Sequence, residues 1–169
     1  MSFMSFPDIK INLDIGKYFS AFEEFDNTHY DNVDIINVYI GLKPIFSWSK
    51  YIGDIGPNHW SIILELSNQK YICIQFDSTG KIDLKARNSL REASLLTWGK
   101  GNTTRLSCYG PCKYNYNKFL DSLNGEHWYI ALVNDCQNFS RKVVKELTGK
   151  NVEVFPPING PIFQNDDKD

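Results

Sequence analysis

The sequence predicts a single α+β domain in which an antiparallel sheet packs against a helix that carries a cysteine. Three observations support this fold class: a β-branched run at 34–45, a hairpin pattern at 59–82 and an amphipathic helix at 135–148. The chain has 169 residues, of which 42% are hydrophobic, and this excludes a mostly disordered protein. We expect the core to span residues 33–155.

Outside this core, residues 1–32 are expected to form an N-terminal extension. Residues 160–169, "GPIFQNDDKD", are expected to form a flexible tail because they are short, polar and acidic. The chain therefore has one domain with two appendages.

The predicted sheet begins with "DIINVYIGLKPI" at 34–45. Its β-branched residues favour a strand, and Pro44 ends it because proline cannot donate a hydrogen bond to a neighbouring strand. "HWSIILEL" and "KYICIQFD" follow, separated by "SNQK", and together they predict a hairpin over 59–82.

The second half of the sequence alternates shorter elements. Residues 83–107 predict a short helix followed by a loop, and "YNYNKFLDSLNG" at 114–125 predicts a helix that ends at Gly125. "HWYIALVN" at 127–134 predicts a strand that leads directly into the helix at 135–148.

Cys136 lies in the first turn of this last helix. Asn134 and Asp135 are residue types that cap helix N-termini, and Gly149 is the type that ends a helix. The unpaired N–H groups and the positive end of the helix dipole favour a thiolate there, so Cys136 is a candidate nucleophile. The residues on the apolar face of the helix are Cys136, Phe139, Ser140, Val143 and Leu147.

His59 is the candidate base for this nucleophile. It follows a loop sequence and opens a strand, and its ordinary pKa of about 6.5 suits deprotonation of a thiol. A third group must hold the other ring nitrogen, and both Gln75 and Asp77 lie on one face of the returning strand. We prefer Gln75, with Asp77 as the alternative, while His127 is the rival base.

These segments resemble a known family. "NHWSIILEL", the polar residue of the next strand and "NDCQNFSRKVVKELTG" are similar to the circularly permuted papain-like fold of NlpC-type cysteine hydrolases, in the lecithin:retinol acyltransferase-like branch, over roughly residues 57–148. The resemblance implies that Cys136 is the nucleophile and His59 the general base, with Gln75 or Asp77 at the third position. Lipid-acting members have a second histidine at that position, whereas NlpC-type peptidases accept glutamine.

The expected function is that of a cysteine-dependent hydrolase or acyltransferase acting on an amide or ester through a thioester. The oxyanion would be held by backbone N–H groups at the helix start, including that of Cys136. The substrate is a peptide, an isopeptide or a lipid acyl group, as in phospholipase/acyltransferases of this fold. The alternative is a catalytically inactive binding module that retains the fold.

The substrate cleft is expected to be shaped by two segments, residues 44–58 and 83–112, which carry no specificity signal of their own. Tryptophans either line this cleft or pack in the core, and core packing is the simpler interpretation. The four tryptophans are Trp48, Trp60, Trp98 and Trp128.

Composition limits the partners and the location. The net charge of −2 without a basic block argues against nucleic acid, and no apolar run is long enough for a transmembrane segment. Without a signal peptide or a disulfide scaffold, we expect a cytoplasmic protein. Cys108 and Cys112 have zinc-like spacing, but a zinc site needs two further ligands and only His127 and the distant His29 are available. We therefore expect no metal and no cofactor. The oligomeric state is left open.

Overall fold

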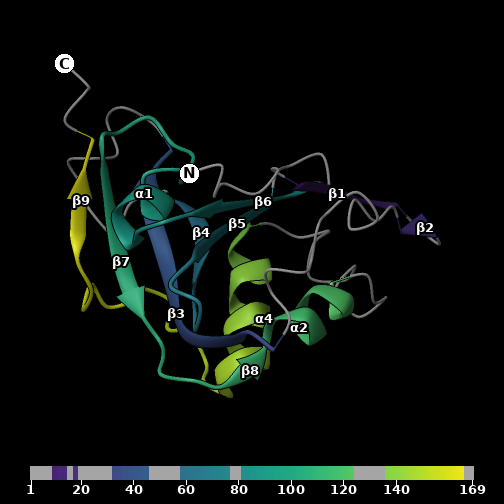
Figure 1. Cartoon of the computed structure of the whole chain (residues 1–169). Helices are drawn as coiled ribbons and strands as arrows, with labels where there is room; N and C mark the ends of the chain where they lie inside the picture. The colour runs from purple at the N-terminus through teal and green to yellow at the C-terminus, as the bar shows by residue number, and fades with distance from the viewer. Residues whose placement is uncertain are drawn as a thin grey trace.

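The computed structural model describes residues 9–14, 17–18, 32–45, 58–76, 81–123 and 136–165. Within these residues, nine strands form one antiparallel sheet with the order β2-β1-β6-β5-β4-β3-β7-β9, and β8 pairs with β3 (Figure 1). The strands are β1 Ile9–Asp14, β2 Lys17–Tyr18, β3 Asp34–Pro44, β4 Asn58–Leu66, β5 Tyr71–Phe76, β6 Lys81–Arg87, β7 Thr103–Cys108, β8 Tyr114–Asn115 and β9 Ile162–Gln164. The described helices are α1 Leu90–Ser94, α2 Tyr116–Ser122 and α4 Cys136–Thr148.

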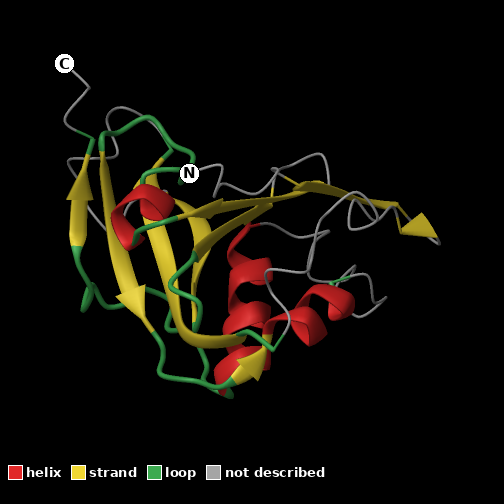
Figure 2. Ribbon diagram, viewed as in Figure 1, coloured by secondary structure: helices red, strands yellow, loops and turns green. Residues whose placement is uncertain are grey.

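The helices lie on both faces of the sheet, with α4 on one face and α1 on the other (Figure 2). Side chains alternate between these faces along each strand, so β4 sends Trp60 and Ile62 toward α4, and Ser61 and Ile63 toward α1. We call these the α4 face and the α1 face. The sheet is therefore covered on both sides, and the fold is α+β, as predicted.

The larger hydrophobic cluster lies under α4. Phe139, which is 1% exposed, packs against Phe76 of β5 with ring centroids 6.1 Å apart. The guanidinium of Arg141 lies 4.8 Å from the centre of the Trp60 ring. These two contacts fix the N-terminal half of α4 over the start of β4 and the end of β5.

Several elements predicted from periodicity are confirmed. β3 ends at Pro44, and β4 and β5 form the predicted hairpin around a turn at 67–70, where Gln69 has a φ of 69°. The helix α4 shows the predicted amphipathic pattern, and the N–H of Gly149 bonds to the Lys145 carbonyl at its end.

Residues 83–107 differ from the prediction. α1 is the expected short helix, capped by Ser89, whose side chain accepts from the N–H of Glu92. The remainder of this region contributes β6 and β7, which were expected as helix or loop. Period-two alternation explains β6, because Ile82 and Leu84 enter the α4-face cluster while Asp83 lies on the other face.

Both appendages contribute strands to the sheet. β1 pairs with β6 at one side, and β9 pairs with β7 at the other. The expectation of a flexible tail over 160–169 is therefore wrong for Ile162–Gln164, because backbone pairing with β7 holds this segment although its side chains are largely exposed. The strand predicted at 127–134 lies outside the described residues.

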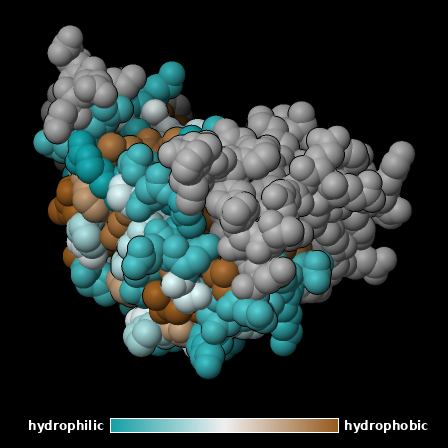
Figure 3. Space-filling view, in the orientation of Figure 1, coloured by the Kyte–Doolittle hydropathy of each residue, from teal (hydrophilic) through white to brown (hydrophobic). Residues whose placement is uncertain are grey.

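The described surface in Figure 3 is mostly hydrophilic, with hydrophobic side chains in small separate groups. Large apolar residues that are exposed include Ile36, Ile45, Val154, Phe155 and Ile162. None of the described helices combines the length and the apolar character required to cross a bilayer.

Candidate functional site

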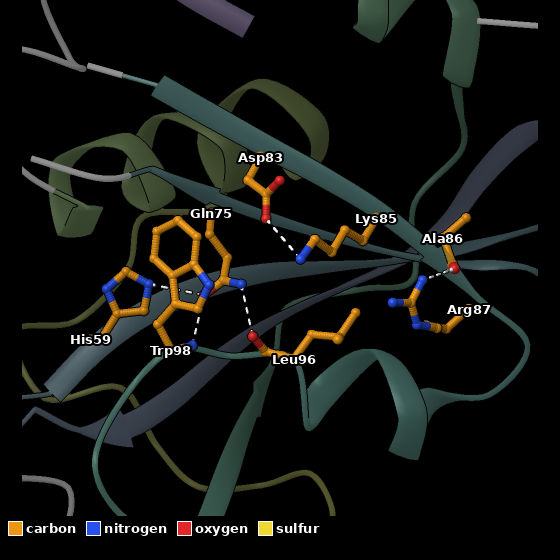
Figure 4. A network of polar contacts seen from close by, with 8 residues as sticks. All are labelled: His59, Gln75, Asp83, Lys85, Ala86, Arg87, Leu96 and Trp98. Atoms are coloured by element: carbon orange, nitrogen blue, oxygen red, sulfur yellow. Dashed lines mark hydrogen bonds and ion pairs between the residues drawn. The ribbon is translucent and has the colours of Figure 1, made fainter. Parts of the chain in front are cut away.

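His59 is the second residue of β4 and is half-buried on the α1 face. Its Nε2 lies 3.1 Å from Oε1 of Gln75 on the adjacent strand β5. The Trp98 ring stacks on the imidazole at a centroid distance of 5.4 Å and an interplanar angle of 30°. Figure 4 shows these three side chains together, with one ring nitrogen of His59 toward Gln75 and the other directed away from it. Gln75 thus contacts the edge of the imidazole ring, and Trp98 contacts its face.

The side-chain amide of Gln75 has only one satisfactory orientation. It is 1% exposed, so its polar atoms need partners within the protein. Its Nε2 donates to the Leu96 carbonyl at 2.8 Å, and its Oε1 accepts from the backbone N–H of Trp98 at 2.8 Å. A flipped amide would place a donor against the Trp98 N–H and an oxygen against the Leu96 carbonyl.

This orientation determines the tautomer of His59. Because Gln75 presents an oxygen, Nε2 of His59 must carry the proton and donate it. In the neutral ring, Nδ1 then holds the lone pair that can accept a proton. Gln75 therefore prepares Nδ1 as a base.

The pKa of His59 is lowered from its usual value chiefly by burial, and the hydrogen bond that His59 donates to Gln75 opposes part of this change. Burial disfavours the imidazolium because the charged ring would lose hydration. The ring is consequently neutral near pH 7, the state that a general base requires.

The lowered pKa predicts a stability change on the acid side. The unfolded chain takes up a proton as the pH falls below about 6.5, whereas the folded chain resists it until the pH reaches the lowered pKa of His59. The free energy of unfolding should therefore fall as the pH decreases through this window. Urea unfolding of the wild type and of His59→Gln between pH 7.5 and 5 measures the effect, and the variant should lose less stability. An equal loss of unfolding free energy in both proteins would contradict a lowered pKa at His59.

The residues that hold Gln75 belong to a segment at 95–100, which we call the strap. It crosses the α1 face after α1 and is attached by the hydroxyls of Thr97 and Ser61, 2.8 Å apart, and by a bond from the Lys100 N–H to the Pro44 carbonyl. The strap lies within residues 83–112, which are expected from the sequence to shape the substrate cleft, but its hold on Gln75 is not predicted. The sequence predicts Trp98 only as a cleft or core residue. Its position before Gly99 in a loop is the one sign that it could lie against another side chain at the surface of the sheet.

The end of the α1 face near His59 is unusually polar for a buried surface. Asp83 of β6 is the cross-strand neighbour of Gln75 and is 2% exposed. Its carboxylate lies 3.6 Å from Nζ of Lys85 (Figure 4). Lys43 of β3, the cross-strand neighbour of His59, is also buried.

Cys136 is the first residue of α4 and is half-buried against the α4-face cluster. Its carbonyl accepts a hydrogen bond from Oγ of Ser140 at 2.8 Å. Because Phe139 and Arg141 contact Phe76 and Trp60, Cys136 lies toward the end of the sheet at which β4 begins. The His59 side chain lies at this same end, but on the opposite face.

The structure therefore brings together two of the three predicted catalytic side chains, His59 and Gln75. It places Cys136 near the same end of the sheet, packed on the other face. The alternative third group Asp77 and the rival base His127 lie outside the described residues, as do the capping positions before Cys136.

The other three cysteines have separate environments. Cys73 is 1% exposed on β5, and burial raises its pKa to about 12. Cys112 is half-buried, its thiol lies 3.5 Å from the Ile35 carbonyl, and burial raises its pKa. Cys108 packs against the α1-face cluster, whereas Cys112 packs against the α4-face cluster. All four cysteines are reduced thiols.

Comparison of this chain with protein-family models, with curated proteins and with solved structures finds no match.

Proposed function

We propose that this protein is a cysteine-dependent hydrolase or acyltransferase in which Cys136 is the nucleophile, His59 the base and Gln75 the residue that orients the base. The observation that carries the proposal is the Gln75-held imidazole, whose Nδ1 is left to accept a proton. A histidine with a fixed tautomer and a lowered pKa is suited to general-base catalysis.

In the proposed reaction, Nδ1 of His59 takes the proton of the Cys136 thiol and the sulfur attacks a carbonyl carbon. The tetrahedral intermediate collapses to a thioester as the C–N or C–O bond breaks, and the imidazolium returns the proton to the leaving group. Water or a second acceptor, deprotonated by His59, then attacks the thioester and regenerates the thiol. Backbone N–H groups at the start of α4, including that of Cys136, would hold the oxyanion.

This mechanism requires the sulfur and Nδ1 to meet around the end of the sheet. His59 is only the second residue of β4 and Cys136 is the first residue of α4, so both lie at element ends. The contacts of Phe139 and Arg141 direct α4 toward this end. The reaction would thus take place at the end of the sheet, beyond the first residue of β4, and not on the α1 face or the α4 face.

The proposed fold relationship is to the circularly permuted papain-like hydrolases, and the order of His59, Gln75 and Cys136 along the chain supports it. The glutamine at the third position favours an amide or isopeptide substrate over a lipid ester, because lipid-acting members of the lecithin:retinol acyltransferase-like branch have a histidine there. The four reduced thiols are consistent with a reducing compartment, and we propose the cytoplasm.

A second candidate function is a binding module that keeps this fold without catalysis. The observation that favours it is the packing of Cys136 and His59 against opposite faces of the sheet. In such a module, Gln75 and Trp98 would serve only to attach the strap to the sheet.

Thiol reactivity separates the two candidates. If Cys136 is activated, iodoacetamide at pH 7 should modify it roughly tenfold or more faster than Cys108 and Cys112. Cys73 should react last, because its thiol is buried and its pKa is raised to about 12. Mass spectrometry of timed, quenched samples gives the four rates. A rate at Cys136 no greater than that at Cys108 would favour the binding module.

A further inference from the structure

The Gln75 amide is fixed by two backbone groups that flank a single residue, Thr97. The Leu96 carbonyl and the Trp98 N–H are the two groups that make only one amide orientation acceptable. A displacement of Thr97 would therefore disturb both partners of Gln75.

Thr97 is itself attached to the strand that carries His59. Its Oγ1 lies 2.8 Å from Oγ of Ser61, two residues after His59 on β4 and on the same face. Thr97 is 2% exposed and Ser61 is 0% exposed, so this hydroxyl pair is shielded from water. A buried hydroxyl pair of this kind is costly to separate, because the Thr97 oxygen would lose this hydrogen bond in a site shielded from water, while Ser61 would keep only its contact with the Cys73 thiol.

Gly41 of β3 lies beneath the hydroxyl pair and leaves space for it. A Cβ on Gly41 of β3 would lie 2.6 Å from Oγ of Ser61 and 3.0 Å from Oγ1 of Thr97. Only glycine leaves space for both hydroxyls over this strand. The γ-methyl of Thr104 lies 3.6 Å from the same point and closes the site from β7.

We infer that Thr97 is a positioning residue whose bond to Ser61 sets the tautomer of His59 by holding the strap that orients Gln75. The order of action is from Ser61 to Thr97, from the strap to the Gln75 amide, and from this amide to Nε2 of His59. Without the Thr97 hydroxyl, the strap keeps its second attachment through Lys100 and Pro44, so the protein should still fold. The Gln75 amide could then flip and donate to Nε2, which would move the ring proton to Nδ1 and remove the base.

The inference rests on the proposed function only for the role given to His59, and its test reads the imidazole itself. In ¹⁵N-histidine-labelled protein at pH 8, wild-type His59 should show a protonated Nε2 and an unprotonated Nδ1. In Thr97→Val the ratio of the two tautomers should shift toward Nδ1–H by about two- to tenfold, as expected for the loss of one net hydrogen bond. Thr97→Ser, which keeps the hydroxyl, should restore the wild-type ratio.

Thr104→Val is the matched control, because it removes a buried threonine hydroxyl at the same site whose Oγ1 has no hydrogen-bond partner in the described structure. It should leave the His59 signals unchanged. If Thr97→Val does not fold, Ser61→Ala removes the same bond from the strand and should produce the same tautomer shift. A wild-type His59 spectrum in folded Thr97→Val or Ser61→Ala would overturn the inference. Inactivity of the wild-type enzyme with a normal tautomer shift would instead count against the proposed function alone.

Discussion

Cys136→Ala is expected to lower the turnover of any amide or ester substrate by at least about a thousandfold, because no thioester can form without the sulfur. The side chain is half-buried at the start of α4, so its truncation should not unfold the protein. Turnover of peptide, isopeptide and acyl-ester probes by matched amounts of the two proteins measures the effect.

Cys108→Ala is the appropriate control for this variant. Cys108 is also a half-buried thiol, but it belongs to β7 and packs on the α1-face cluster. Its replacement should leave turnover within about twofold of the wild type. A probe that is hydrolysed equally well by Cys136→Ala does not report a reaction at this site, and the absence of any Cys136-dependent probe would support the binding module.

Gln75→Leu is expected to have the largest effect on stability among the site variants. Leucine can neither accept from the Trp98 N–H nor donate to the Leu96 carbonyl, and both bonds measure 2.8 Å in the native protein. Each buried polar group left without its partner costs about 1–3 kcal/mol, so the free energy of unfolding should fall by about 2–6 kcal/mol. Urea denaturation at pH 7.5 gives this difference directly.

The same substitution at an exposed site provides the comparison. Gln164 lies on the edge strand β9 with an exposed side chain, and Gln164→Leu should change stability by less than about 0.5 kcal/mol. A loss below about 1 kcal/mol in Gln75→Leu would mean that water replaces the lost bonds and that Gln75 does not hold the strap.

The sequence was sufficient to predict the hairpin and the last helix, because both carry a strong period. β4 and β5 have β-branched residues around a polar turn, and α4 places apolar residues three and four apart. β6 and β7 carry a weaker apolar signal, because charged residues alternate with apolar ones in β6 and most residues of β7 are polar. In β6 the alternation of Ile82, Asp83 and Leu84 was nevertheless present and should have indicated a strand.

The pairing of His59 with Gln75 was also predictable, since strand alternation places both side chains on one face of the hairpin. The face that α4 covers was not predictable, because β4 carries apolar residues on both sides. Ile62 faces α4 and Ile63 faces α1, and both are fully buried. The side that the helix takes is determined by tertiary packing, which includes the contact of Phe139 with Phe76.

The strap could not be predicted for a different reason. Its hold on Gln75 comes from two backbone groups, those of Leu96 and Trp98, and backbone partners leave little trace in residue type. The glycine beneath the Thr97 hydroxyl carries information only after the fold has placed β3 under the strap. The sequence therefore predicts His59 and Gln75 as members of the site, but not the backbone groups that orient Gln75.

The decisive quantity is the rate at which Cys136 is alkylated as a function of pH, compared between the wild type and His59→Gln. If the imidazole deprotonates the sulfur, the wild-type rate should rise at a lower pH than the variant rate, and the variant should react at least about tenfold more slowly at pH 7. The rate at Cys108 should be the same in both proteins. Identical pH profiles for Cys136 in the two proteins would contradict the assignment of His59 as its base.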